Sequence, residues 1–127
     1  MSRVMIIDDD RDTTRLLELI LSREGYDVKA INDAFSAVDA AVSFRPDLIL
    51  LDVMMPYVDG FEVCRKLQSQ TQLKDTPIVF FTAKGDADTQ LTAFQAGGAG
   101  FLHKPVHPNE LKLKIRALVG SRQAAGG

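Results

Sequence analysis

The sequence lacks several features that mark whole classes of proteins. It has one cysteine, Cys64, so an internal disulfide is excluded and nothing points to an oxidising compartment. No apolar run approaches the roughly 18 residues that a membrane span requires. The first residues, Met1–Val4, lack the succession of basic, apolar and small residues of a signal peptide. We therefore expect a cytoplasmic protein without membrane contact.

The sequence also lacks an excess of charge and is poor in glutamate. Fifteen basic residues stand against 17 acidic ones, and a net charge of -2 disfavours a protein whose main role is to bind nucleic acid. The acidic residues are 13 Asp and only four Glu. Asp favours caps, turns and the ends of elements, whereas Glu favours helix bodies. We therefore expect the carboxylates to gather where helices and strands begin or end.

The apolar residues form short runs that are typical of strands buried in a parallel sheet. These runs are Val4–Ile7, Val28–Ile31, Leu48–Leu51, Ile78–Phe81 and, more weakly, Gly100–Leu102. A stretch of helical periodicity follows each run. The chain therefore predicts one α/β domain, a parallel sheet with right-handed crossovers and helices on both faces.

Each expected helix carries apolar residues at helical spacing. The sets are Leu16, Leu17, Ile20 and Leu21; Ala34, Val38, Ala41 and Val42; Phe61, Cys64 and Leu67; Leu91 and Phe94; and Leu111, Ile115, Leu118 and Val119. Residues 68–77 are expected to extend the third helix or form a loop. After Val119 the apolar pattern stops, so we predict a domain over residues 1–119 and a flexible tail or linker over 120–127.

Polar side chains follow four of the five strands. Asp8, Asp9 and Asp10 follow the first, Asp52 the third, Thr82 the fourth and Lys104 the fifth. The second strand ends in Asn32-Asp33, which resembles ordinary helix capping. Ligands of open α/β sheets bind beyond the carboxyl ends of the strands. The sequence therefore predicts a site with several carboxylates, a hydroxyl and an ammonium at one sheet edge.

The acidic first loop excludes the usual way in which such folds bind nucleotides. No glycine-rich phosphate loop follows any strand, and clustered carboxylates repel anions unless a cation is present. A divalent metal such as Mg²⁺ suits oxygen ligands and leaves room for a phosphoryl oxygen. Asp52 can then attack phosphorus as a nucleophile, while Lys104 and Thr82 stabilise the transferred group.

Four segments together resemble the receiver domain of two-component response regulators, the CheY-like superfamily. They are Val4–Asp10, Leu50–Gly60 with its Met-Met-Pro, Phe81–Ala83 and Gly98–Pro105. The resemblance runs from about Val4 to Val119. It implies a flavodoxin-like (βα)5 fold of strand order 2-1-3-4-5, and a phosphorylation-activated switch rather than an enzyme, one that catalyses only its own phosphorylation and dephosphorylation.

The resemblance also implies roles for individual residues. Asp52 is the phosphoacceptor, and Mg²⁺ or Mn²⁺ is held by Asp9, Asp52 and the backbone carbonyl of Met54, with Asp8 binding directly or through water. Lys104 pairs with the acceptor carboxylate and later with the phosphoryl group. Thr82 moves to the phosphoryl group, and the switch aromatic Phe101 turns inward with it. The fourth helix, fifth strand and fifth helix then form the output surface.

Some residues depart from the family pattern. Phe101 stands where Tyr is common, so an inward ring would depend on burial alone. Met54 and Lys84 neighbour the path of the hydrolytic water in the family, and neither can orient that water. We therefore expect slow dephosphorylation. His103 and His107 flank Lys104-Pro105 and are expected to face solvent.

Several partners and alternatives stay open from the sequence. The phosphodonor would be a sensor histidine kinase or phosphotransfer protein, and the output a downstream protein or tethered effector domain. A phosphorylation-dependent homodimer is a further option. A phosphorylation-independent interaction module would lack one of the functional groups. An aspartyl-nucleophile phosphatase would need a carboxylate at Met54.

Overall fold

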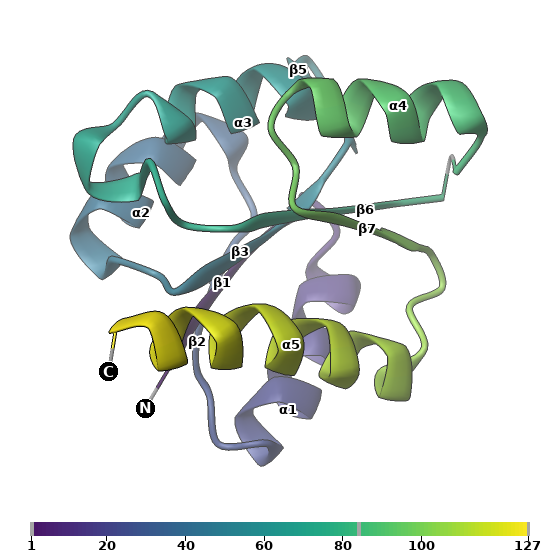
Figure 1. The fold of residues 1–127 in the computed structure, drawn as a ribbon. Helices are drawn as coiled ribbons and strands as arrows, with labels where there is room; N and C mark the ends of the chain where they lie inside the picture. The colour runs from purple at the N-terminus through teal and green to yellow at the C-terminus, as the bar shows by residue number, and fades with distance from the viewer. Residues whose placement is uncertain (1, 84, 127) are drawn as a thin grey trace.

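The computed structural model describes residues 2–83 and 85–126. Its sheet has five strands in the order β2-β1-β3-β6-β7, and all neighbouring pairs are parallel. This arrangement, shown in Figure 1, confirms the predicted flavodoxin-like fold.

The strands are β1 Arg3–Ile7, β2 Asp27–Ile31, β3 Leu48–Asp52, β6 Ile78–Thr82 and β7 Gly100–His103. The helices are α1 Arg11–Arg23, α2 Ala37–Phe44, α3 Gly60–Gln68, α4 Ala87–Gln95 and α5 Pro108–Gly126.

The helices lie in two layers, one on each face of the sheet. Figure 1 shows α1 and α5 on one side and α2, α3 and α4 on the other. Successive strand residues point to opposite faces, so Met5 and Ile7 pack with the α2–α3–α4 layer while Val4 and Ile6 pack with α1 and α5. Every residue of β3 is buried because this strand lies between β1 and β6. The edge strand β2 is only partly covered.

Aspartates begin four of the helical segments, as their abundance predicts. Asp10 caps α1, Asp59 caps α3 and Asp86 caps α4, and each side chain accepts a backbone N–H of the first turn. Asp33 does the same for a 3-10 turn at Ala34–Ser36, which leads into α2. Four of the 13 aspartates therefore serve to satisfy free N–H groups at the starts of helical segments.

Three apolar residues of the predicted helical patterns are exposed. Leu16 of α1 is 56% exposed, and Leu91 and Phe94 of α4 are 57% and 54% exposed. In α1 the buried apolar positions are Leu17 and Leu21, one turn apart. A helix packed on a sheet hides only one stripe, so the adjacent Leu16 falls outside it. The helical spacing of Leu16, Leu91 and Phe94 therefore predicts a helix but does not show which residues it buries.

The remaining segments complete the frame around the sheet. A two-stranded hairpin, β4 Met54–Met55 with β5 Val58–Asp59, follows β3 and was not predicted. Helix α3 ends at Gln68, and the connection to β6 forms a 3-10 turn, Thr71–Leu73, anchored by buried Leu73. Helix α5 continues beyond Val119 to Gly126. In the described part of the chain, no helix is both long and apolar enough to cross a lipid bilayer.

Candidate functional site

The predicted functional residues lie at one edge of the sheet because their strands are parallel neighbours. Asp52 ends β3 and Thr82 ends β6, while Asp8 follows β1 and Lys104 follows β7. Strand β3 pairs with both β1 and β6, and β6 pairs with β7. Residues far apart in the sequence are thereby brought to the same place, as the sequence predicts.

Three carboxylates form the centre of this site. One oxygen from each of Asp8, Asp9 and Asp52 lies within 4.8 Å of the others. Asp8 is fully buried and Asp52 is 3% exposed, whereas Asp9 is open to solvent. Asp10 serves a different purpose, because its side chain accepts the N–H of Asp12 and the hydroxyl of Thr13 at the start of α1. The acidic triplet is therefore divided between the site and a helix cap.

Lys104 lies between the two buried carboxylates. Its Nζ is 2.8 Å from Oδ2 of Asp8 and 3.4 Å from Oδ2 of Asp52. The same ammonium lies 4.9 Å from the centre of the Phe81 ring, in cation–π contact. The expected pairing with Asp52 is present, but the shorter contact is with Asp8. The lysine therefore partly neutralises the pair rather than one member of it.

Burial and charge strongly affect the acidity of these groups. Burial, and then repulsion by Asp8, raise the pKa of Asp52 to about 7, although Lys104 and the N–H of Met54 oppose the shift. Burial also acts against the charged form of Lys104, yet its contacts with Asp8 and Asp52 hold the pKa of its ammonium above the ordinary value. The site thus carries more negative charge than one lysine can balance, so a second cation would relieve it.

An asparagine that the sequence analysis overlooked fixes the first acidic loop. The side-chain nitrogen of Asn32 donates to the backbone oxygen of Asp8 and to Oγ1 of Thr14, both at 2.9 Å. The N–H of Asp10 donates to Oδ1 of Asp8 at 3.0 Å. The sequence pattern groups Asn32 with Asp33 as helix-capping residues, whereas in the structure Asp33 is the residue that caps. The sequence signal for this role of Asn32 was its position directly after β2, the strand beside β1.

The segment after Asp52 packs closely against the sheet. The N–H of Met54 donates to Oδ1 of Asp52 at 3.3 Å, while the Met54 side chain is 59% exposed at the mouth of the site. A Cβ on Gly60 would lie 2.5 Å from the backbone oxygen of Asp52 and 2.8 Å from Cα of Val53. Only glycine permits this approach, so Gly60 lets α3 begin directly behind the acidic strand end.

The two residues expected to switch lie on neighbouring strands. Thr82 is buried, and the N–H of Lys104 donates to its backbone oxygen at 2.9 Å. Phe101 is half-buried and packs against the α2–α3–α4 layer. Lys84 lies outside the described residues, and His107 is exposed as expected. His103 is exposed too, but its ring contacts Phe101.

The oxygen-only cluster suits a hard divalent cation. Mg²⁺ and Mn²⁺ prefer carboxylate and carbonyl oxygens, and the described residues of the cluster supply three carboxylates and no sulfur or imidazole. The residues present therefore fit such a metal.

A family model for the response regulator receiver domain matches residues 4–116, which carry every part of this site. The chain belongs to this family. The receiver is 38% identical to the DNA-binding dual master transcriptional regulator RpaA of Synechocystis sp. over 94% of its own length and 49% of the relative's. It is 40% identical to the response regulator MprA of Mycobacterium avium over 92% of its own length and 50% of the relative's.

Solved structures agree with the assignment. The chemotaxis protein CheY4 of Vibrio cholerae superposes with a TM-score of 0.89 at 30% identity, covering 93% of this receiver and 98% of that chain. A putative response regulator from Chloroflexus aurantiacus gives 0.88 at 30% identity, covering 94% and 98%. By contrast, the receiver spans about half the length of the curated relatives that it matches.

Proposed function

We propose that this receiver accepts a phosphoryl group from a phosphohistidine onto Asp52, and that the acyl phosphate changes the surface formed by α4, β7 and α5. One observation carries the proposal. A buried carboxylate, Asp52, stands within 4.8 Å of two others and 3.4 Å from an ammonium. A lone structural carboxylate would gain nothing from acidic neighbours, whereas a phosphoacceptor gains a cation site beside it.

The transfer is a substitution at phosphorus. An oxygen of ionised Asp52 forms the new O–P bond, the P–N bond of phosphohistidine breaks, and its electron pair returns to the imidazole nitrogen. Lys104 can stabilise negative charge on the phosphoryl oxygens. Its present contact with Asp8 keeps the ammonium at the site before the phosphoryl group arrives.

Asp8, Asp9, Asp52 and the backbone carbonyl of Met54 would hold Mg²⁺ or Mn²⁺. The metal would supply charge neutralisation for the carboxylates and for the phosphoryl oxygens. Thr82 would donate its hydroxyl to the phosphoryl group, and Phe101 would turn further inward in response. Because Phe101 has no hydroxyl, its inward position would depend on burial.

Hydrolysis of the acyl phosphate is expected to be slow. The side chain of Met54 is exposed at the mouth of the site, where it can cover Asp52 but cannot orient water. Lys84, the other residue expected to influence hydrolysis, likewise has no acceptor oxygen for a water hydrogen. A phosphoryl lifetime of only seconds at neutral pH would contradict this expectation.

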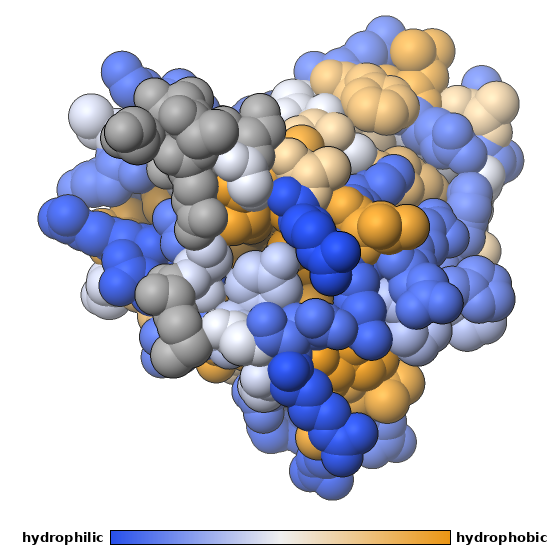
Figure 2. Space-filling model, turned by 60° about the horizontal axis from the view of Figure 1, so that its bottom comes forward, coloured by the Kyte–Doolittle hydropathy of each residue, from blue (hydrophilic) through white to orange (hydrophobic). Residues whose placement is uncertain are grey.

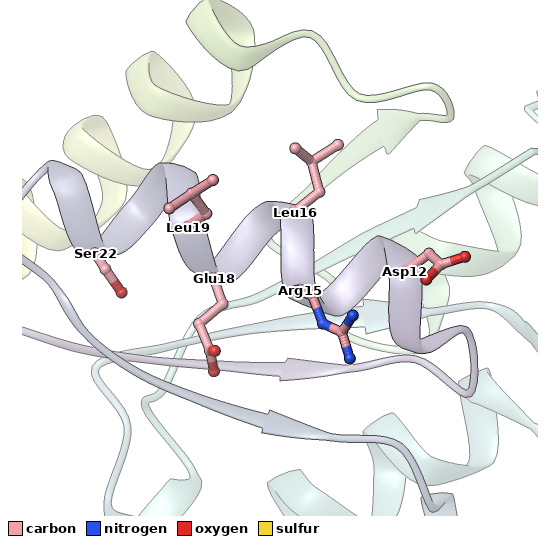
Figure 3. A pocket seen from close by; sticks show the side chains of 6 residues that line it. All are labelled: Asp12, Arg15, Leu16, Glu18, Leu19 and Ser22. Atoms are coloured by element: carbon pink, nitrogen blue, oxygen red, sulfur yellow. The ribbon is translucent and has the colours of Figure 1, made fainter.

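The phosphodonor protein is proposed to approach over α1. Leu16 and Leu19 are exposed on this helix, beside a cleft that Leu16 shares with Lys104 and Pro105. Figure 3 shows Leu16 and Leu19 projecting from one side of α1 and Arg15 and Glu18 from another. In Figure 2 the face that includes α1 and α5 shows apolar surface among charged side chains. A histidine kinase or phosphotransfer protein bound there could reach Asp52.

The output would act on another protein or on a tethered effector domain, since the curated relatives are about twice as long as this chain. A homodimer formed through α4 and α5 is a second route, and exposed Leu91 and Phe94 on α4 favour it. The phosphatase alternative lacks its second carboxylate, because Met54 occupies that position.

The test is phosphorylation by a small phosphodonor such as acetyl phosphate. We expect Mg²⁺ and the donor to add one phosphoryl group by intact mass, and Asp52→Asn to abolish the gain. Asp39→Asn, on the exposed surface of α2, is the matched control and should still be phosphorylated. No gain in the wild type, or a gain that persists in Asp52→Asn, would refute the proposal.

A further inference from the structure

A cluster of contacts at the end of β7 joins three parts of the receiver. His103 is the last residue of β7 and pairs in register with Thr82 of β6. Its ring meets the edge of the Phe101 ring, with the centres 5.3 Å apart and the planes at 67°. His103 therefore contacts Phe101, the expected switch residue. It also lies beside Thr82, the residue expected to contact the phosphoryl group.

Gln90 connects this ring to the loop that leads from β6 to α4. Its side-chain nitrogen donates to the backbone oxygen of Gly85 at 3.2 Å and lies 3.4 Å from Nε2 of His103. An amide nitrogen only donates, so a hydrogen bond at this contact requires Nε2 of a neutral imidazole to accept and its hydrogen to lie on Nδ1.

Gly85 lies directly against the imidazole. A Cβ at this position would collide with Nδ1 and Cε1 of His103. The ring therefore packs on the backbone of the loop, three residues after Thr82. Loop, strand end and first turn of α4 meet at one side chain, and Figure 1 shows β6 and β7 leaving the sheet on the same side.

We propose that His103 and Gln90 are positioning residues that restrain the loop after Thr82, and so regulate how readily the receiver is phosphorylated. The inference rests on the proposed function, in which Thr82 moves toward a phosphoryl group on Asp52. Such a movement pulls on a loop that Gln90 and the imidazole hold at Gly85. Weakening these contacts should make the phosphorylated arrangement easier to reach.

The contacts also explain how Phe101 takes part. An inward turn of the Phe101 ring would remove its present contact with the His103 ring and so free the imidazole from one side. Release of the loop and rotation of Phe101 therefore favour each other. Phe101 lacks the hydroxyl that a tyrosine would have at the switch position. His103 would instead couple the loop at Gly85 to the Phe101 ring.

The variants are Gln90→Leu and His103→Ala, with Gln95→Leu on α4 and His107→Ala before α5 as matched controls. With acetyl phosphate and Mg²⁺, we expect phosphorylation to be faster by about two- to fivefold in Gln90→Leu and His103→Ala, the size expected for loss of one modest hydrogen bond. The controls should keep the wild-type rate. Mg²⁺ affinity should stay unchanged in all four variants.

Gly85→Ala provides an independent variant, because it displaces the imidazole without removing Gln90 or His103. It should accelerate phosphorylation in the same direction. In the wild type, ¹⁵N NMR of the His103 ring should show hydrogen on Nδ1, and beryllium fluoride with Mg²⁺ should change this signal as the contact opens. A purely structural role would leave the ring signal unchanged.

The outcomes separate the two proposals. If the wild type takes up no phosphoryl group, the proposed function fails and the restraint falls with it. If the wild type is phosphorylated but the variants match their controls, or the His103 signal does not respond to beryllium fluoride, the restraint is refuted and the proposed function stands. Acceleration together with the ring signal supports both.

Discussion

At the scale of single residues, the acidic side chains owe their different properties to burial. Asp52 and Asp8 are buried next to each other, while Asp9 and Asp10 face solvent. Burial and the charge of Asp8 raise the pKa of Asp52 to about 7. In Asp10, the hydroxyl of Thr13 lowers the pKa of the carboxyl instead. Four aspartates of identical chemistry therefore differ in their surroundings: Asp8 and Asp52 are buried together, Asp9 is open to solvent, and Asp10 caps a helix.

The raised pKa of Asp52 predicts how stability depends on pH without metal. Between about pH 4 and pH 7 the folded protein holds a proton on Asp52 that the unfolded chain has released. The free energy of unfolding should therefore fall as the pH rises through this window. We expect Asp52 to account for roughly 2–4 kcal/mol of this fall.

The measurement is urea unfolding in EDTA across this pH range, comparing the wild type with Asp52→Asn. The variant cannot ionise at residue 52, so its free energy of unfolding should exceed that of the wild type most at about pH 8. Equal pH profiles for the two proteins would contradict the predicted shift. Added Mg²⁺ should restore wild-type stability at high pH, because binding to the folded state favours it.

At the scale of elements, caps and exposed faces determine how each helix is used. Helices α1, α3 and α4 begin where aspartates supply acceptors. Arg45, the C-cap of α2, adopts a left-handed conformation before Pro46. The apolar pattern predicts that the helices form, but not the width of the face that each one buries. Helix α4 buries mainly Ala93, whereas its larger apolar residues lie outside.

The start of α1 allows the cap and the metal site to be tested separately. Asp10→Ala removes the acceptor for Asp12 and Thr13, so we expect it to lower the free energy of unfolding by about 1 kcal/mol and to leave Mg²⁺ affinity nearly unchanged. Asp9→Ala should abolish measurable Mg²⁺ binding and change metal-free stability by less than about 0.5 kcal/mol.

Calorimetric Mg²⁺ titration and urea unfolding in EDTA measure the two effects. Each variant serves as the control for the other, because the residues are adjacent and carry the same charge. Suppose that Asp10→Ala loses Mg²⁺ binding and Asp9→Ala retains it. Assigning Asp9 to the metal site and Asp10 to the helix cap would then be wrong.

At the scale of the whole molecule, the sheet separates two surfaces. Helices α1 and α5 cover one face, and α2, α3 and α4 cover the other. The carboxylate edge lies between them. The proposed docking surface on α1 and the α4 part of the proposed output surface therefore lie on opposite sides of the sheet, with the carboxylates between them.

This separation predicts distinct effects of surface variants. Leu16→Ser and Leu19→Ser on α1 should slow phosphotransfer from a histidine kinase about tenfold or more, in the range of interface hot spots. Phosphorylation by acetyl phosphate should keep its rate. Leu91→Ser, equally exposed but on α4, is the control for kinase transfer.

Rates are measured with a phosphorylated histidine kinase that transfers to the wild-type receiver, and in parallel with the small donor. Kinase transfer that is unaffected in both α1 variants would remove α1 from the docking surface. Equal slowing with both donors would mean that the substitutions disturb the site itself.

The sequence by itself determined the order of elements, the helix starts and the strand ends that carry chemistry. These features are local: strand runs, Asp caps and the residues directly after each strand follow from neighbours in the chain. Parallel strand order then makes Asp8, Asp52, Thr82 and Lys104 neighbours. Much of the fold and the central residues of the site were therefore predictable.

Only the tertiary structure decided which of these groups share contacts. It placed Lys104 closer to Asp8 than to Asp52, brought Asn32 under the acidic loop, and packed His103 onto Gly85. It also left Leu16 exposed while burying Leu17. These outcomes depend on distances between segments that meet only after folding. Burial sets the acidity of Asp52, and Asp52 is buried only when the sheet and both helix layers are assembled.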